Sequence, residues 1–474
     1  MFEDGCTLRV VTSTSDNLNE LTRDELIELV RKMREELDRL SKLLQELKRK
    51  SHRQANPFSK NRPKIDPKPP GRKPGQGRFE NRPAPPELPT DIKVQVSTPK
   101  QCPRCGGQVD LERVETATVT DLPPMPAPVV MRYAVPVCRC RNCGKSVRGE
   151  APGLANDQSG ATAHRMGPGV MAMAHFLHYD LGIPTRKVPQ VLREMAGIAL
   201  TASAITQDAL RKADGVLGEL YQRLRDSIKR FPFVHTDDTS WRIGGKNAFL
   251  MAFDSDGAVV YQIRNQHRSE EVLEIIPGDF AGVLVTDRGK SYDSKVFENV
   301  TQQKCLGHML RNISEVLESK TGPARSFGLR LQGLLRGGIE IWKRDPTGED
   351  RQKAVQELEE QLTRLLRDRI LTDDDNQRLL NGIGAQMDRG HVLTFLHVPG
   401  VEPTNNRAER ILRPAVIARK VSHCSKNERG AHAFSVFLSV FQTIRKMLPG
   451  AARSIAALLP GMVLETSPPI RLLR

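Results

Sequence analysis

The sequence has few aromatic residues and no long apolar run. Aromatic side chains make up 5% of its 474 positions, with 2 Trp and 5 Tyr. No apolar stretch approaches the ~20 residues that a membrane-spanning helix needs. The start, with Glu3 and Asp4, lacks the apolar core of a secretory signal. We therefore expect a soluble cytoplasmic protein without a membrane partner. The shortage of rings also disfavours a zinc-containing RNA-binding protein, because RNA recognition relies on base stacking.

Acidic residues are outnumbered by basic ones. The chain has 72 Lys and Arg against 56 Asp and Glu, a formal net charge of +16 with a pI of about 9.6. This balance favours a polyanionic partner, most simply DNA or RNA. A basic surface that serves solubility alone is the other interpretation, and charge does not separate nucleic acid from an anionic membrane.

Residues 1–50 contain a heptad pattern, and a linker follows them. Seven apolar residues alternate in steps of four and three: Leu26, Val30, Met33, Leu37, Leu40, Leu44 and Leu47. This narrow stripe predicts a coiled coil that pairs two protomers, with an amphipathic helix docked on its own protein as the alternative. Residues 51–90 are rich in Pro, Lys and Arg, which predicts a disordered basic linker because such a segment cannot bury a core.

Cysteines are scarce but clustered, since five of the eight lie between positions 102 and 143. Four of them form two CxxC pairs, each followed by glycine: Cys102, Cys105, Cys140 and Cys143. Clustering in an intracellular chain favours metal binding over disulfides. Four thiolates suit one structural Zn²⁺, so we predict a zinc ribbon over 91–150. Cys138 is an alternative to Cys140 as ligand, and reduced, unligated cysteines are the alternative to the ribbon.

The region 151–230 has a helical pattern. One periodic segment runs from Gly182 to a glycine turn at Gly197, and a second follows Thr201, a residue type that caps helices. Two helices joined by a short turn predict a helix-turn-helix DNA-binding region. An ordinary helical subdomain is the alternative.

From residue 231 the periodicity changes to that of strands. Two apolar strands flank a turn at Asp254–Gly257, and a later apolar run ends at Asp287. A hairpin meander followed by a helix and another strand fits a ribonuclease-H-like α/β catalytic domain over 231–450, with a helical insertion at about 302–389. With a tail over 451–474, we expect a multi-domain α+β protein.

Carboxylates stand where two of these apolar runs end. Asp237 and Asp238 follow the first run, and Asp287 follows the later one. Glu409 lies on a predicted helix among arginines. In a ribonuclease-H-like sheet such positions converge, and their hard oxygens suit two Mg²⁺ ions that assist phosphoryl transfer. Taken singly, the aspartates fit turns, and Glu409 could pair with Arg413 on one helix face.

Four segments resemble, in this order, the transposases of the bacterial insertion-sequence-66 family. They are Asp237-Asp238-Thr239, Thr286-Asp287-Arg288-Gly289-Lys290-Ser291-Tyr292, Cys305-Leu306-Gly307-His308-Met309-Leu310-Arg311, and Asn405-Asn406-Arg407-Ala408-Glu409-Arg410 with Arg413-Pro414 and Arg419-Lys420. The resemblance spans roughly Phe231 to Met447. The coiled coil, zinc ribbon and helical region upstream are also similar to that family's layout.

The resemblance implies a DDE transposase. Asp237, Asp287 and Glu409 would be the catalytic acids and would hold two Mg²⁺ or Mn²⁺ ions. The family usually has Asp-Glu-Thr where this chain has Asp237-Asp238-Thr239, so Asp238 is a second candidate for the first ligand. Because strand residues alternate between faces, only one of the two can point into the site, and we assign Asp237.

Other residues take supporting roles by the same resemblance. The auxiliary residues near the chemistry are Asp238, His308, Arg311, Asn405 and Asn406. The expected DNA phosphate contacts are Arg410, Arg413, Arg419 and Lys420. Cys305 and His308, three residues apart, could belong to a second zinc site, but a structural role beside the active site is the preferred interpretation.

The implied protein binds transposon terminal repeats, cleaves phosphodiester bonds and joins the 3′-OH to target DNA. It would act in the bacterial cytoplasm as a homo-oligomer of at least two chains. The resemblance leaves open whether accessory transposition proteins take part. A metal-dependent, structure-specific nuclease with the same core is one alternative, and a domesticated transposase-derived DNA-binding protein is another.

Overall fold

The computed structural model describes residues 165–447 apart from 345–347 and 368–369, most of 96–149, and scattered positions from 22 to 40. The chain divides into two compact units, Met1–Asp121 and Leu122–Arg474. The expected linker over 51–90 and the tail over 451–474 lie outside the described residues. So does most of the heptad pattern, although the few positions described between 23 and 40 are helical.

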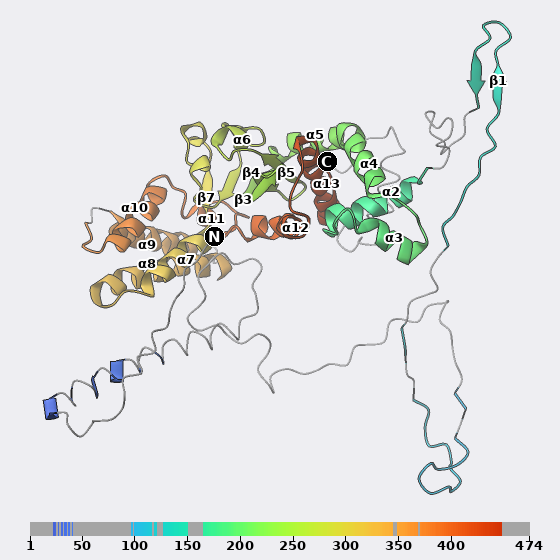
Figure 1. The fold of residues 1–474 in the computed structure, drawn as a ribbon. Helices are drawn as coiled ribbons and strands as arrows, with labels where there is room; N and C mark the ends of the chain where they lie inside the picture. The colour runs from blue at the N-terminus through green and yellow to red at the C-terminus, as the bar shows by residue number, and fades with distance from the viewer. Residues whose placement is uncertain are drawn as a thin grey trace. The chain divides into compact units, whose positions relative to one another are not determined.

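A five-stranded sheet forms the centre of the second unit (Figure 1). Its strands are β3 (Phe233–Ile243), β4 (Lys246–Asp254), β5 (Val259–Arg264), β6 (Val283–Thr286) and β7 (Gln302–Lys304). They lie in the order β5-β4-β3-β6-β7, with β4 antiparallel to both neighbours and β3, β6 and β7 mutually parallel. The mixed α+β class is confirmed. The hairpin meander and the later strand ending before Asp287 are present as expected, whereas β7 was not predicted.

The helices before the sheet follow the expected helix–turn–helix order. They are α2 (Pro168–His175), the π-helix η3 (Phe176–Asp180), α3 (Val188–Ala196), α4 (Ala202–Asp214) and α5 (Val216–Ile228). Gly197, with a φ of 63°, ends α3, and the Thr201 hydroxyl caps α4 by accepting from the amide of Ala204 at 3.2 Å. The first helix begins at Val188 rather than near Gly182, whose φ of 73° is left-handed and does not fit a helix.

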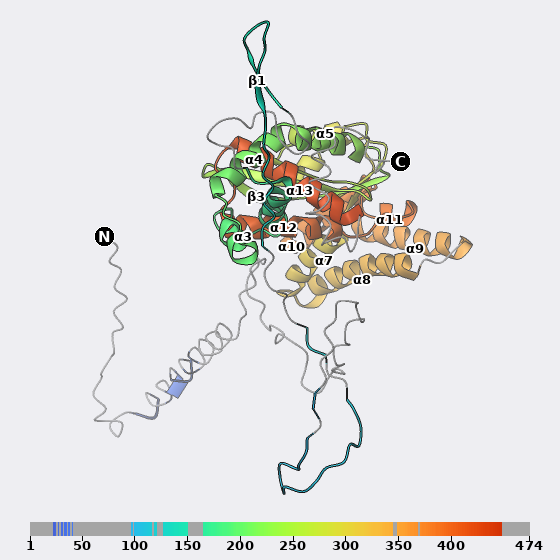
Figure 2. The ribbon, with the colours of Figure 1, turned by 90° about the vertical axis from the view of Figure 1, so that its right-hand side faces the viewer.

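The helices after β7 form the expected insertion. They are α7 (Leu306–Leu317), α8 (Gly322–Arg344), α9 (Gly348–Leu366) and α10 (Asp374–Asp388). A short α11 (Thr394–His397) follows them in the sequence. Figures 1 and 2 both show α7–α10 on one side of the sheet and α3 and α4 on the other. The insertion starts later than the predicted residue 302, because Gln302–Lys304 form the fifth strand. This polar strand is buried because the Gln303 side chain bonds the Val392 carbonyl and the Phe395 amide, each at 3.0 Å.

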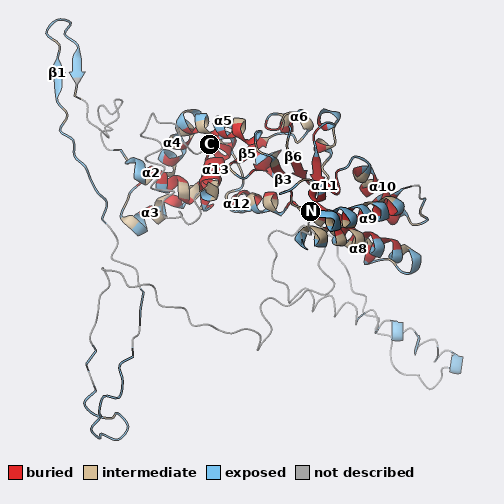
Figure 3. Cartoon of the chain, turned by 180° about the vertical axis from the view of Figure 1, so that it is seen from behind, coloured by how far each residue is buried: buried red, intermediate tan, exposed pale blue. Residues whose placement is uncertain are grey.

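The sheet separates two apolar cores. Leu284 of β6 faces a core shared with α5, α12 (Asn406–Ser422) and α13 (Glu428–Met447). Its neighbours Val283 and Val285 face the core of the insertion, as alternation along a strand requires. Figure 3 shows the buried residues gathered along the sheet and α13, with exposed residues on the outer faces of α8 and α9. None of the helices in the described ranges is long and apolar enough to cross a membrane.

Candidate active site

Three acidic side chains that are far apart in sequence come together at the middle of the sheet. Asp237 lies on β3, Asp287 directly follows the adjacent parallel strand β6, and Glu409 lies in the first turn of α12. Helix α12 packs against β3 and β4. The charges of Asp287 and Glu409 both act on the Asp237 carboxyl group. The structure therefore brings the three predicted acids within electrostatic range of one another.

Asp237 is the most perturbed of these acids. Burial raises its pKa to about 8, and the charges of Asp287, Asp238 and Glu409 add to the rise. The Asp238 amide, which donates to Asp237 Oδ1 at 2.9 Å, opposes it. Carboxylates that repel one another in a poorly solvated site favour a bound cation, and their hard oxygens fit Mg²⁺ or Mn²⁺.

The acids are not arranged as a closed metal cage. Within the part of the chain that the structure describes, no three His, Cys, Asp or Glu side chains surround one point closely enough to hold an ion. Glu409 has 39% of its side chain exposed and lies next to His308. The donor set fits a divalent cation by its chemistry, as hard carboxylate oxygens.

Asp238 has a partner of its own. His267 Nδ1 lies 3.3 Å from Asp238 Oδ1, and Ser291 Oγ lies 3.3 Å from His267 Nε2. Burial lowers the pKa of His267, but the hydrogen bond and charge of Asp238 outweigh it, so the pKa is raised overall. This arrangement favours Asp237 as the first ligand, which stays a prediction. Sequence reasoning missed His267, which no motif marks, and it quoted Ser291 in a family-like segment without giving it a role.

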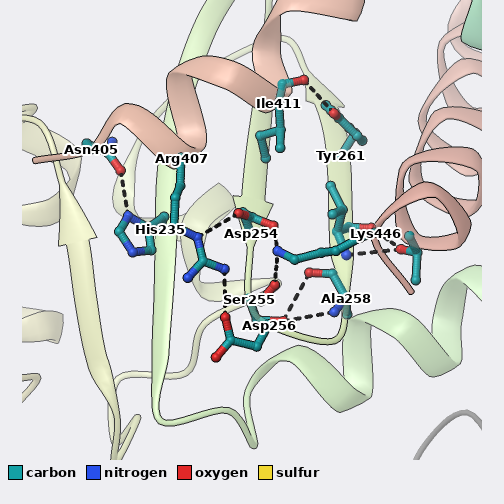
Figure 4. A network of polar contacts seen from close by, with 12 residues as sticks. His235, Asp254, Ser255, Asp256, Ala258, Tyr261, Asn405, Arg407, Ile411 and Lys446 are labelled. Atoms are coloured by element: carbon teal, nitrogen blue, oxygen red, sulfur yellow. Dashed lines mark hydrogen bonds and ion pairs between the residues drawn. The ribbon is translucent and has the colours of Figure 1, made fainter. Parts of the chain in front are cut away.

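Asn405 connects two of the acid-bearing segments. Its side chain is fully buried, and Nδ2 donates to the carbonyl of Thr236, the residue before Asp237, at 2.7 Å. Its Oδ1 accepts from Nδ1 of the buried His235 at 3.3 Å (Figure 4). Its carbonyl accepts from the amide of Glu409 at 3.1 Å, within α12. Asn405 therefore ties the first acid to the third.

Cys305 connects the remaining segment. Its sulfur accepts from the Asn405 amide at 3.2 Å, and its own amide donates to the carbonyl of Thr286, the residue before Asp287, at 2.8 Å. Cys305 is 1% exposed, and burial raises the pKa of its thiol. These contacts support the structural role rather than the second zinc site.

The first turn of α7 lies beside Glu409. His308 Nε2 is 3.8 Å from Glu409 Oε1. Arg311, almost one turn further along α7, is exposed. Both predicted auxiliary residues therefore face the region of the third acid or the solvent next to it.

The predicted auxiliary and DNA-contact residues of α12 divide into two groups. Asn406, Arg410, Arg413 and Lys420 are exposed and recur at the spacing of one helix face, starting beside Glu409. Arg419 instead donates from Nη1 to Ser240 Oγ on β3. Arg410 and Arg413 therefore lie on the exposed face of the helix, whereas Arg419 is engaged with the sheet.

Arg407 anchors the start of α12 and is also unavailable. Its guanidinium lies 3.2 Å from Asp254 Oδ2 and 2.9 Å from Asp256 Oδ1, and Lys446 of α13 completes the pairing of Asp254 (Figure 4). Asp254 is 3% exposed, and Arg407 is packed over the Phe233 ring. This ion cluster fixes the helix that carries Glu409 against the β4–β5 turn.

The two CxxC pairs adopt the same turn, each in its own unit. In both turns, the amide of the first cysteine donates to the carbonyl of the residue five positions later. The amide of the glycine after the second cysteine donates to the carbonyl of the first cysteine. These distances are 2.8–2.9 Å. The glycines, Gly106 and Gly144, have φ values of 75° and 67°. Backbone amides in the turns, led by Arg104 for Cys102 and by Cys143 for Cys140, lower the pKa of both thiols. Cys138 lies outside the turn, on the short strand β1 (Val137–Arg139).

Comparison with known proteins gives a consistent family. The family described as "Transposase IS66 family" matches residues 164–433. Transposases for insertion sequence element IS256 in transposon Tn4001, from Staphylococcus aureus and from Enterococcus faecalis (strain ATCC 700802 / V583), are 24% identical over 177 residues. That match covers 33% of this chain and 44% of theirs, less than half the length of these relatives.

One solved structure is also similar, at a low level. The HTLV-2 integrase catalytic core domain in complex with magnesium (dimeric form) is 12% identical, and the match covers 32% of this chain and 97% of that one. The TM-score of this match is 0.14.

Proposed function

The chain belongs to the IS66 transposase family, and from that membership we propose that it is a DDE transposase with a ribonuclease-H-like catalytic domain. It binds transposon terminal repeats, cleaves phosphodiester bonds there and joins the freed 3′-OH to target DNA. The observation that carries this proposal is the placement of Asp237 on β3, Asp287 directly after the parallel neighbour β6, and Glu409 in the first turn of α12. In support, burial and then the charges of nearby acids raise the pKa of Asp237. Strongly perturbed carboxyls are typical of functional sites.

Asp237, Asp287 and Glu409 would hold two Mg²⁺ or Mn²⁺ ions, which supply the Lewis-acid chemistry of phosphoryl transfer when bound. Asn405 and Cys305 would keep the backbone of all three acids in fixed relation. His308 would orient the Glu409 carboxylate.

The DNA would run along the exposed face of α12. Arg410 and Arg413 follow directly from Glu409 on that face and would bind phosphates, with Lys420 further along. The α3–α4 pair would recognise the terminal repeats. These contacts would give affinity that falls steeply with salt.

Cys102, Cys105, Cys140 and Cys143 would be the ligands of one structural Zn²⁺. The support is that each turn already stabilises a thiolate, which is the form that binds zinc. Metal analysis of the purified chain should find about one zinc per chain. Its absence would refute the ribbon.

The N-terminal helix would pair two protomers. Val30, Met33, Leu37 and Leu40 are each more than half exposed, although they belong to the apolar stripe. Because a coiled coil buries such a stripe against a partner helix, its removal should lower the oligomeric state measured by light scattering.

The experiment that tests the function is cleavage of DNA carrying the sequences that flank the gene. Asp287→Asn and Glu409→Gln should abolish cleavage and leave DNA binding nearly intact. Asp226→Asn, at an acid of α5 that pairs only with its neighbour Lys229 and with Gln222, is the matched control. Cleavage at the wild-type rate by either active-site variant would remove that acid from the mechanism.

A second assay separates the transposase from a nuclease. Precleaved ends incubated with a plasmid should give joined products. Cutting without joining would indicate a structure-specific nuclease, and DNA binding without any metal-dependent cutting would indicate a transposase-derived regulator.

A further inference from the structure

A fully buried lysine lies beside the second acid. Lys304, the last residue of β7, is 0% exposed. It stands opposite Thr286 in the parallel pairing of β6 and β7, and Asp287 is the next residue. A buried ammonium group is costly in a protein interior unless it is paired and hydrogen-bonded. Its partners therefore indicate its role.

The Lys304 ammonium group has two polar partners and an aromatic one. Nζ lies 2.9 Å from Asp293 Oδ1 and donates to Thr286 Oγ1 at 3.1 Å. It also lies 5.7 Å from the centroid of the Tyr292 ring. Burial lowers the pKa of Lys304, while its bond to Asp293 and then the charge of Asp287 oppose the change. The lysine thus interacts with the second acid electrostatically, through space.

All of these partners belong to the segment that carries Asp287. The Thr286 hydroxyl donates onward to the Asp287 carbonyl at 2.7 Å. The amide of Gly289 donates to Asp287 Oδ1 at 2.8 Å and so orients the carboxylate. The Tyr292 hydroxyl lies 3.2 Å from Thr236 Oγ1, next to the first acid. Lys304 therefore holds both ends of the loop that follows Asp287.

The helical insertion holds the same loop from its other side. Gln386 Nε2 donates to Asp293 Oδ2 at 2.9 Å, and Arg389 Nη1 lies 3.6 Å from Asp293 Oδ1. The backbone amide of Lys304 donates to the carbonyl of His391 at 2.8 Å. The end of α10 and the segment after it therefore meet the loop at Asp293 and Lys304.

We propose that Lys304 is a positioning residue for Asp287, through which the helical insertion sets the geometry of the metal site. It acts through Thr286 and Asp293 and does not touch the reacting atoms. The inference rests on the proposed function, because it concerns the same three acids. It gives the insertion a task beyond packing, since a shift of α10 would displace the loop that orients the second acid.

Calorimetric titration of the full chain with Mg²⁺ tests this without requiring turnover. Lys304→Met keeps the length and burial of the side chain but removes its charge. The dissociation constant for Mg²⁺ should rise about 10-fold, which is the effect expected when a residue that supports a metal ligand is removed. Binding of DNA in the absence of metal should be unchanged, because Lys304 is buried.

The matched control is Lys320→Met. Lys320 Nζ lies 2.7 Å from Asp373 Oδ2 and 2.8 Å from Asp375 Oδ2, so it ties the turn between α7 and α8 to the start of α10, the opposite end of that helix from Gln386. That variant should bind Mg²⁺ like the wild type. If Lys304→Met does not fold, as judged by circular dichroism, Asp293→Asn takes its place, with a smaller loss of Mg²⁺ affinity expected.

Two outcomes would overturn the inference in distinguishable ways. Equal Mg²⁺ affinity in the wild type and in the folded loop variant would refute the positioning role and leave the proposed function standing. A wild-type chain that binds no Mg²⁺ would refute the proposed function, and the inference with it. An equal loss of affinity in Lys320→Met would show that any weakening of the insertion has this effect, which also contradicts a specific role for Lys304.

Discussion

At the scale of single residues, the site depends on buried polar groups that each satisfy several partners. Asn405 bonds Thr236, Cys305 and His235, and no water is needed to explain its burial. A buried polar group that loses its partner costs about 1–3 kcal/mol. The side chain that sets the geometry of the acids therefore also contributes to stability.

Asn405→Ala should lower the free energy of unfolding by about 3 kcal/mol, because the Thr236 carbonyl and His235 lose a buried partner. DNA cleavage should also fall. Urea unfolding measures the first effect. Asn406→Ala, at the exposed neighbouring position, should change stability by less than about 0.5 kcal/mol. Equal stability losses in the two variants would contradict the connecting role of Asn405.

A buried histidine in the insertion predicts a dependence of stability on pH. Burial, and then the charge of Lys304, lower the pKa of His391 from 6.5 to about 4. Between pH 4 and pH 6.5, His391 therefore binds a proton in the unfolded chain but not in the folded chain. The free energy of unfolding is highest above pH 6.5 and falls toward pH 4, by about 1 kcal/mol per pH unit from this residue.

His391→Gln should make that decline shallower in urea unfolding between pH 6.5 and pH 5. The buried His175 and His235 and the half-buried His178 also have lowered pKa values and keep part of the decline in both proteins. Identical slopes for the variant and the wild type would show that His391 is not kept neutral by the fold.

At the scale of elements, sequence reasoning succeeded where apolar residues define the element. The runs that became β4, β5 and β6 are apolar, and Asp287 could be located from the end of β6. Asp237 was expected where its apolar run ends, but β3 continues past it to Ile243, so it lies within the strand. The strand β7 could not be found, because Gln302–Lys304 is polar and its burial depends in part on bonds to a segment some ninety residues later. The roles of His267 and Lys304 were missed for the same reason, since loop and insertion geometry places them.

Helix α12 offers a test that separates structural arginines from those that bind DNA. Arg407→Met should lower the free energy of unfolding by about 2 kcal/mol, because it leaves Asp256 unpaired and the buried Asp254 with Lys446 alone. Arg413→Met, at an exposed position, should leave stability unchanged within about 0.5 kcal/mol.

DNA binding should respond to the arginine substitutions in the opposite way to stability. Arg413→Met should weaken binding and reduce the slope of log K against log salt by about 1, because one phosphate contact is lost. Fluorescence anisotropy at several salt concentrations measures this slope. A slope unchanged from the wild type would remove Arg413 from the proposed DNA path.

At the scale of the whole molecule, the three acids lie where separate layers meet. Asp287 follows a strand that faces both cores, Asp237 lies on the central strand, and Glu409 belongs to a helix of the opposite layer from the insertion. The site therefore needs both the sheet and α12 in place. The net charge of +16 suits a polyanion that approaches this junction.

The most direct test of the shared site is a crystal structure of the protein grown with Mn²⁺, whose anomalous scattering locates the ions. The account predicts anomalous peaks between Asp237, Asp287 and Glu409, with carboxylate oxygens of all three about 2.1 Å from an ion. If saturating Mn²⁺ gave no anomalous peak between the three acids and left their carboxylates unmoved, the account would be contradicted. Peaks only elsewhere in the protein would contradict it as well.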